Sequence, residues 1–463
     1  MRTADEWLSP YVPTDADPFD RAKAAHLGRR AGFGFTDAEI ERCIQQGPQR
    51  TLDLLLHPGE AGQERFTALL EQIGGELLDL SKEEDLQAWW VFRMLHTPDP
   101  LREKLTLFWH GHFATSLRKV ERAALMQRQN ETLRTHALGK FGELLQALAK
   151  DPAMLVWLDN RVNRKGKPNE NWARELMELF TLGVGNYSEQ DIKEVARAFT
   201  GWTVREDQFF FDKAQHDEGK KTIHGKEGAF DGGDVITILL EQPACARFVA
   251  GKLFRFFVAP KAPEGVIETL AARLQQSGYD LAACVETILR SRVFFTAEAR
   301  RTRIKSPVEF VLGIVKSLEL RADCRGLARA TRELGQALFA PPTVKGWDGE
   351  RIWLSAQWLV NRANIAMGAA ALRGGWAESR FEPLKLLERK RAAGSAAEVL
   401  DCVAGLLLDG RLPAELRPSL LEYMTQNDGK RPLPFDPKNK SQIDAKARGL
   451  AHLLMTTPEY QLA

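Results

Sequence analysis

Residues 169–183 read NENWARELMELFTLG, and the fold of the chain can be worked out from this stretch. Its apolar residues Trp172, Leu176, Leu179 and Phe180 recur at steps of three and four, the period of a helix with one buried face. Gly183 follows, and glycine readily adopts the left-handed conformation that ends a helix. The stretch therefore predicts an amphipathic helix that packs on a core.

The polar residues of this helix allow two interpretations. Glu175 and Glu178 are three residues apart and project from one side, while Arg174 and Glu178 are four apart and can pair. Exposed ion pairs of this kind contribute about 0.3–0.5 kcal/mol, as on any solvated helix face. The other interpretation is a helix that brings carboxylates to a functional site. The residues alone favour the solvated face.

The same helical pattern continues through most of the chain. Asp99-Pro100 and Asp151-Pro152 are typical helix starts, with Asp as N-cap and Pro at the first helical position. Alternating apolar residues occur clearly only around 202–211, where they predict a hairpin. We therefore expect a mainly α protein with a single large helical core and a small β-hairpin near 202–211. The expected domains are an extended N-terminal lead-in (1–20), a helical core with the site cleft (21–372) and C-terminal helices packing on that core (373–463).

Composition narrows the function classes. The 463 residues include 64 basic and 62 acidic residues, a net charge of +2 that gives no support to nucleic-acid binding. No run of about 18 apolar residues is present, so no membrane span is expected. The N-terminal residues lack the apolar segment of a secretory signal, and the five cysteines show neither a disulfide framework nor metal-ligand spacing. We expect a cytoplasmic protein.

Two histidines flank a glycine at the end of the helix that begins at Asp99-Pro100. His110 and His112 would point about 200° apart on a regular helix and could not share a ligand. We expect Gly111 to end the helix and to let both rings converge. A third histidine, His216, lies in a long polar loop, a kind of segment that is often functional.

Several motifs together resemble a known bacterial family of uncharacterised proteins, domain of unknown function 1800. The similarity runs from Ala25 to Gln461. The motifs that carry it are Phe108-Trp109-His110-Gly111-His112-Phe113, His136-Ala137-Leu138-Gly139, Asn169 to Gly183, Phe199-Thr200-Gly201-Trp202-Thr203, His216-Asp217, Lys305-Ser306-Pro307-Val308-Glu309-Phe310 and Pro342-Thr343-Val344-Lys345-Gly346-Trp347-Asp348-Gly349.

The resemblance implies a mainly helical protein without an established reaction. Many members are encoded beside proteins that resemble alkaline phosphatases and sulfatases, so a partner of that kind is implied as well. Many members look exported, whereas this chain lacks the signal. The family often has His at the position of Phe180 and Asn at that of His110, so these two positions depart from its pattern.

Histidine and carboxylate together are the usual ligands of catalytic zinc, iron or manganese. The expected metal ligands are His110, His112, Glu175, Glu178 and His216, and the expected catalytic residues are Glu175, Glu178, His216, Arg174 and Lys221. The hypothesis is an enzyme, hydrolytic and metal-dependent, although no HExxH motif is present.

Three alternatives stay open at this point. A single glutamate could act as acid or base without metal. Arg174, Arg161 and Lys221 could form a pocket for phosphate, sulfate or carboxylate. The protein could instead be a non-catalytic helical partner of a phosphatase- or sulfatase-like protein.

The two enzyme hypotheses share one geometric expectation, a common cleft for segments that are distant in sequence. We expect these segments to meet there: 108–113, 169–182, 189–200 and 213–226. Asp191 and Glu194 would then orient a histidine from behind.

Overall fold

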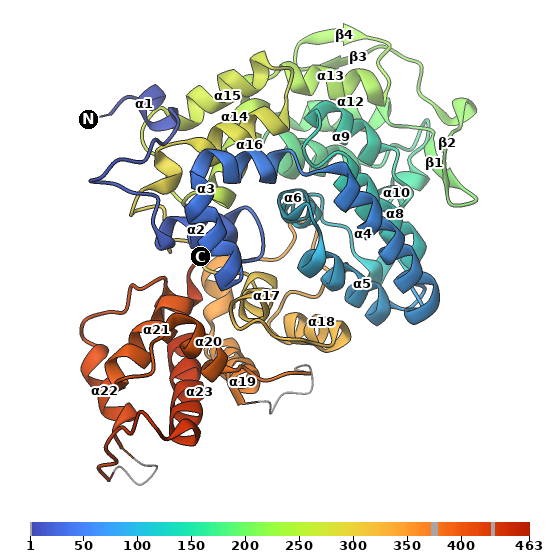
Figure 1. The fold of residues 1–463 in the computed structure, drawn as a ribbon. Helices are drawn as coiled ribbons and strands as arrows, with labels where there is room; N and C mark the ends of the chain where they lie inside the picture. Colours follow the sequence, from blue (N-terminus) through green and yellow to red (C-terminus); the bar gives the residue numbers. More distant parts are fainter. Residues whose placement is uncertain (1, 372–377, 427–430) are drawn as a thin grey trace.

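A computed structural model describes residues 2–371, 378–426 and 431–463. The chain is mainly helical, and the strands in the described residues form two small antiparallel pairs (Figure 1). The predicted hairpin is present as β1 (Trp202–Arg205) and β2 (Gln208–Phe211), with Trp202 opposite Phe211. The predicted fold class is confirmed.

The first part of the chain is helical throughout. Its helices are α1 (Ala4–Leu8), α2 (Arg21–Arg30), α3 (Asp37–Leu56), α4 (Glu60–Gln72), η1 (Ile73–Leu77), α5 (Glu83–His96), α6 (Pro100–His112), α7 (Leu117–Val120), α8 (Ala123–Thr135), α9 (Phe141–Ala149), α10 (Pro152–Trp157) and η2 (Asn160–Val162). Asp99 and Asp151 cap α6 and α10 with their side chains, as their position before a proline predicts.

The middle part begins with the acidic stretch. Its elements are α11 (Asn171–Glu175), η3 (Leu176–Thr181), α12 (Glu189–Ala198), β1, β2, η4 (Lys213–Gln215), β3 (Lys221–Ile223), β4 (Lys226–Gly228), α13 (Gly232–Glu241), α14 (Pro243–Phe257), α15 (Val266–Gln276), α16 (Leu281–Arg290) and η5 (Val293–Phe295).

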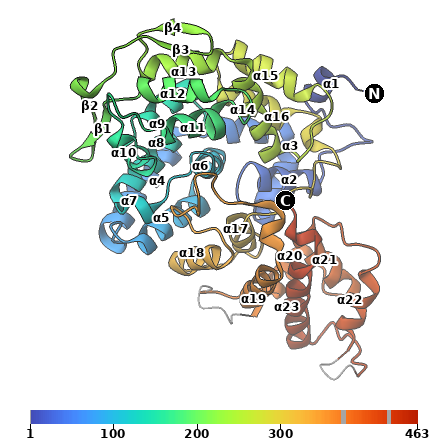
Figure 2. The ribbon, with the colours of Figure 1, turned by 180° about the vertical axis from the view of Figure 1, so that it is seen from behind.

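The C-terminal helices of the last part lie at one end of the molecule (Figures 1 and 2). Its elements are α17 (Pro307–Ser317), α18 (Cys324–Glu333), η6 (Glu350–Leu354), α19 (Ala356–Ala371), α20 (Pro383–Lys390), α21 (Ala396–Leu408), α22 (Arg417–Met424), α23 (Lys440–Thr456) and η7 (Glu459–Gln461). One apolar cluster joins these helices to α5, and a second joins α2, α6 and α9 to α14–α16.

Three short elements were not anticipated from the sequence. The predicted extended lead-in contains the helix α1, the polar loop after His216 contains the hairpin β3–β4, and the segment before α21 contains α20. These elements are short, and their apolar residues are too few to show a period. The boundary expected at residues 372–373 lies outside the described residues.

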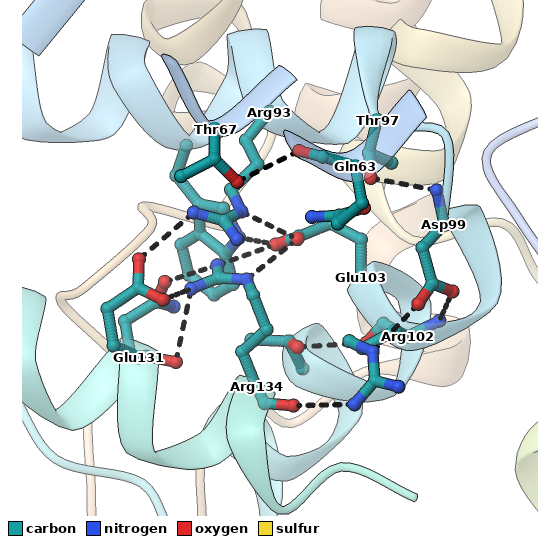
Figure 3. Close-up of polar contacts among 12 residues, drawn as sticks. Gln63, Thr67, Arg93, Thr97, Asp99, Arg102, Glu103, Glu131 and Arg134 are labelled. Carbon is teal, nitrogen blue, oxygen red and sulfur yellow. Dashed lines mark hydrogen bonds and ion pairs between the residues drawn. The ribbon is translucent and has the colours of Figure 1, made fainter. Parts of the chain in front are cut away.

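A buried ion network holds α5, α6 and α8 together (Figure 3). The Glu103 carboxylate on α6 accepts two hydrogen bonds of 2.8 Å from Arg134 and one of 3.1 Å from Arg93. Trp90 donates a further bond to it from the indole nitrogen. Both arginines also pair with Glu131, which is 43% exposed, whereas the Glu103 side chain is 2% exposed. The network therefore fixes α6 from two sides.

Replacing Glu103 by Gln is expected to lower the free energy of unfolding by about 3–5 kcal/mol, since two buried guanidinium groups lose their carboxylate. Burial raises the pKa of Glu103, but Arg134 and Arg93 outweigh burial and lower the pKa below its usual value. The stabilisation is thus complete above the unfolded-state pKa and is lost as pH falls through the lower folded-state pKa. Thermal melts across an acidic pH series measure both effects.

The matched control is Glu131→Gln, which removes the half-exposed carboxylate from the same two arginines. Its expected cost is about 1 kcal/mol or less. Equal costs for the two variants would show that burial of Glu103 is not what gives the network its strength.

Candidate functional site

The end of α6 carries both histidines of the predicted pair, but on different sides. The helix runs through Gly111 and ends after His112, so the expectation that Gly111 stops it and lets the rings converge is wrong. Helical continuation past a glycine costs only about 1 kcal/mol, which packing readily offsets. His110 and His112 consequently have separate environments.

His110 is enclosed by aromatic rings. It makes edge contacts with Trp90 and Trp347, and its Nε2 accepts a hydrogen bond of 3.2 Å from the backbone N–H of Phe339. Burial lowers the pKa of His110 to about 3, so the ring is neutral at ordinary pH. The lone pair that a metal would need already accepts a protein hydrogen.

His112 faces the acidic helix and α14. Its Nε2 lies 3.0 Å from the carbonyl oxygen of Phe180, so this nitrogen carries the hydrogen and donates it. Its Nδ1 therefore accepts from Nζ of Lys252, at 2.9 Å. Burial and then the charge of Lys252 hold the pKa of His112 well below its usual value. Burial and then Arg255 lower the pKa of Lys252 to about 8.

The acidic stretch is helical as predicted, but only partly an α-helix. After α11 it widens into the π-helix η3, in which the N–H groups of Leu182 and Gly183 both donate to Met177. Gly183 ends it with a φ of +83°, as expected. The carbonyls of Leu179 and Phe180 accept from Lys252 and His112. Widened turns of this kind expose carbonyls that a regular helix would use internally, and they recur at functional sites.

The two glutamates of this helix have different partners. Glu178 accepts a hydrogen bond of 2.7 Å from the hydroxyl of Tyr187, which sequence reasoning missed. Glu175 has no hydrogen-bond partner among the described residues. Burial and then Glu178 raise its pKa, against smaller opposing effects of Arg174 and Lys345.

Arg174 does not pair with Glu178 as predicted. It binds Glu189 on α12 through two hydrogen bonds of 2.8 and 3.0 Å, with Glu170 at 3.5 Å. A forked carboxylate bond across two helices is stronger than a pair along one helix face, so Glu189 is the preferred partner. The arginine thus joins α11 to α12.

The motif loop 342–349 covers the end of α6. Gly346 has a φ of +89°, and a Cβ atom there would lie 2.5 Å from the carbonyl oxygen of Gly111. The Trp347 ring lies on Gly111, at 3.8 Å from the position of a Cβ. Lys345 is near enough to Glu175 to lower its pKa. Three motifs, 108–113, 169–183 and 342–349, therefore meet at one place.

The loop with His216 and Lys221 is held by bonds to α12 and to the residues that follow α12. His216 Nδ1 donates to the Thr200 carbonyl at 2.9 Å, and Lys221 Nζ donates to the backbone carbonyls of Asp217 and Gly219. Asp191 and Glu194 accept from backbone N–H groups of this loop, at His224 and Thr222, so they order the loop and do not bond to an imidazole.

The described residues contain no group of three or more His, Cys, Asp or Glu side chains arranged to hold a metal. Among the predicted ligands, His216 keeps Nε2 and His110 keeps Nδ1 without a hydrogen-bond partner in the described part of the chain, whereas both ring nitrogens of His112 are bonded. The metal site therefore stays a prediction, and it would need rearrangement around His112.

A pocket of 610 Å³ lies beside the hairpin β1–β2, lined mainly by the basic loop 161–169 and by residues of 201–215. Arg161, one of the residues predicted to bind an anion, lines it together with Arg164 and Lys167. None of these three cations forms an ion pair within residues 2–371, 378–426 and 431–463. Arg174 and Lys221, which the sequence suggested as further anion ligands, do not line this pocket. Its cations are Arg161, Arg164 and Lys167.

The fold and these side chains define a mainly helical protein whose ionisable residues gather where three sequence motifs meet. The chain belongs to the family described as Protein of unknown function (DUF1800), whose model matches residues 26–462. The resemblance seen in the motifs is confirmed. No curated protein and no solved structure matches the chain. No helix in the described part is long and apolar enough to cross a membrane.

Lys252, Tyr187 and Lys345 are the site residues that the sequence did not single out. For Lys252 a signal was available, because it stands in a helix whose neighbouring positions Phe248 and Phe256, four residues away on either side, are aromatic. A lysine on such a face is desolvated and needs an acceptor.

Gly346→Ala is expected to displace the motif loop, because the new Cβ would collide with the Gly111 carbonyl. Gly166→Ala is the matched control, with a φ of +77° but nothing within 4 Å of the added Cβ. Both substitutions carry the strain of a left-handed residue, about 1–2 kcal/mol. Gly346→Ala should cost about 1–3 kcal/mol more, measured by denaturant unfolding. Equal costs would show that the loop can move away freely.

Proposed function

We propose that the protein is an acid–base enzyme, hydrolytic in type, whose site lies where the end of α6, the helix 171–181 and the loop 342–349 meet. The observation that carries this proposal is the 2.9 Å contact between Lys252 Nζ and His112 Nδ1. Lys252 is the general base and Glu175 is the general acid. His112 is a positioning residue, because it touches Lys252 and not the reacting atoms.

The chemistry follows from opposite pKa shifts of two groups, Lys252 on α14 and Glu175 on α11. A lysine whose pKa is about 8 has an appreciable fraction of free amine near neutral pH and can take a proton from water. A glutamate whose pKa is raised keeps its proton to higher pH than usual and can give it to a leaving group. Hydrolysis needs both steps. Glu175 ends α11, and Lys252 Nζ lies 3.4 Å from the carbonyl oxygen of Leu179 in the π-helix that follows it.

His112 fixes where the Lys252 amine points. Because the Phe180 carbonyl holds the Nε2 hydrogen, Nδ1 can only accept, so one N–H of Lys252 is directed at the ring. The ring stays neutral, since burial and Lys252 keep its pKa low. A neutral acceptor, unlike a carboxylate, does not raise the pKa of the lysine strongly.

Two further proposals from the sequence keep a place beside this one. A metal-dependent site would use the five ligands predicted from the sequence, which are His110, His112, Glu175, Glu178 and His216. The observation in its favour is that His216 presents a free Nε2 while a backbone carbonyl holds Nδ1. Metal analysis of the purified protein tests it, with His216→Ala as the variant. The second proposal is a non-catalytic helical partner of a phosphatase- or sulfatase-like protein, which needs no proton transfer. Absence of turnover on all substrates tested would favour this proposal over the enzyme.

Lys252 reactivity can be measured without knowing the substrate. Acetylation over a pH series, followed by mass spectrometry, is expected to show Lys252 gaining reactivity with a midpoint of about 8. An unstructured lysine peptide is the reference and should show a midpoint of about 10.4. Burial disfavours the charged amine of Lys252, which is the reason for the difference. An ordinary midpoint for Lys252 would remove the general base.

Lys252→Arg and Lys252→Met separate catalysis from structure. Arginine keeps a donor for His112 and the carbonyls but stays protonated, so it cannot act as a base. We expect Lys252→Arg to retain the melting temperature and to lose turnover on a panel of ester and phosphoester substrates by about 10²–10⁴-fold. If Lys252 has only a structural role at the end of the π-helix, Lys252→Met should lower the free energy of unfolding by about 1–3 kcal/mol. In that case Lys252→Arg should keep both the stability and the activity of the wild type.

A further inference from the structure

A second group of ionisable residues, distinct from those of the proposed site, lies where the C-terminal helices meet α2 and α17 (Figure 1). It contains seven buried or nearly buried cations and two side-chain carboxylates. The cations are Arg29, Arg30, Lys104, Arg301, Arg303, Lys305 and Arg362, and the carboxylates are Glu309 and Asp409. Such an excess of buried positive charge is costly unless something compensates it.

The two carboxylates are already occupied. Asp409 accepts from Arg29 at 2.8 and 3.0 Å and from Arg301 at 3.0 Å. Glu309 is bound by Lys104 at 2.5 Å and by Arg303. Four cations thus share two carboxylates, and none of the other three forms an ion pair within the part of the chain that the structure describes.

Two of those three cations have carbonyl or amide acceptors. Arg30 donates to the backbone carbonyl oxygens of Val258 and Ala299 and to an oxygen of Ala463, the last residue of the sequence, each at 3.0 Å. Arg362 donates to the backbone oxygen of Lys305 at 2.8 Å and to the Gln461 side chain. Both guanidinium groups therefore have partial compensation from oriented dipoles.

Lys305 is the exception. The residue is 4% exposed, and its Nζ lies 3.5 Å from the centre of the Tyr460 ring. Among the described residues Nζ has no hydrogen-bond acceptor. Burial, then the charges of Arg301 and Arg29, hold the pKa of Lys305 well below its usual value. A lysine with three potential donors and no acceptor is unusual inside a protein.

A cavity lies beside this lysine. Its volume is 30 Å³, and its polar lining consists of Lys305, Arg29, Asp409, Glu309, Ser317 and Tyr460. A buried water needs about 10–15 Å³ by this measure, so the cavity has room for about two waters or for one ion of similar size. The ion that the surrounding charges attract is an anion.

We propose that this cavity binds a small inorganic anion, of the size of chloride, which accepts hydrogen bonds from Lys305 Nζ and neutralises the excess positive charge. The anion lies between residues of α2, of the segment before α17, and of the C-terminal elements α21 and η7. It therefore stabilises the packing of the C-terminal helices on the rest of the molecule.

The proposed anion gives a role to the one polar residue of the motif Lys305-Ser306-Pro307-Val308-Glu309-Phe310 whose side chain has no bond within the part of the protein that the structure describes. Ser306 and Glu309 form the capping box that begins α17, and Pro307 occupies the first helical position. Glu309 also holds Lys104 and Arg303. Among the polar side chains of this motif, only that of Lys305 makes no hydrogen bond or ion pair with the described residues. A bound anion would accept a hydrogen bond from Lys305 Nζ.

The test is the melting temperature at constant ionic strength while chloride or bromide replaces gluconate, which is too large for the cavity. A ligand that binds only the folded state raises the melting temperature with the logarithm of its concentration. We expect a rise of several degrees for the wild type, and the same rise for the exposed control Lys438→Met. Lys305→Met removes the buried charge at similar volume and should fold stably in gluconate and show no rise.

Crystals grown in bromide give a second, independent measurement on the wild type. We expect an anomalous peak inside the cavity, within hydrogen-bond distance of Lys305 Nζ. An equal rise in Lys305→Met, no rise in the wild type, or a cavity that holds only water would each overturn the proposal. None of these outcomes concerns Lys252, so they leave the proposed enzymatic function untouched.

Discussion

The bond between Glu103 and its two arginines is the interaction on which the position of the site depends. It holds α6 against α5 and α8 from inside the protein, where a carboxylate persists only because Arg134 and Arg93 compensate it. The far end of the same helix carries His110 and His112. A rotation of α6 about its axis would move both rings, so the network sets which histidine faces Lys252 and which faces Trp347.

Close backbone approach then adds the remaining parts of the site. Gly346 lets the motif loop reach the carbonyl of Gly111, and this contact brings Lys345 towards Glu175 and Trp347 onto His110. The π-helix turns the carbonyls of Leu179 and Phe180 towards α14 and α6. Neither the close approach at Gly346 nor the π-helix can be recognised from a sequence motif. The π-helix supplies the carbonyl of Leu179 to Lys252, and its Phe180 carbonyl orients His112 as a neutral acceptor for the same lysine.

Buried charge is handled in two different ways within one molecule. Around Glu103 the two arginines have two carboxylates, one of which reaches solvent, so charge is balanced by the protein itself. Around Lys305 the cations outnumber the carboxylates, and the balance requires a ligand. The first region fixes helices of the core, and the second lies where the C-terminal helices join it. Attachment of those helices would then respond to the anions in solution.

The sequence by itself determined the helical class, most helix positions, the hairpin at 202–211 and the family, because apolar period, capping residues and contiguous motifs are local properties. It also predicted that the segments 108–113 and 169–182 meet, and His112 does contact Phe180. Only the tertiary structure decided that His112 meets Lys252, that Arg174 binds Glu189 and that the His216 loop packs on α12. Such pairings depend on which residues distant in sequence are brought together and on how far each group is desolvated, and neither quantity is encoded in local spacing.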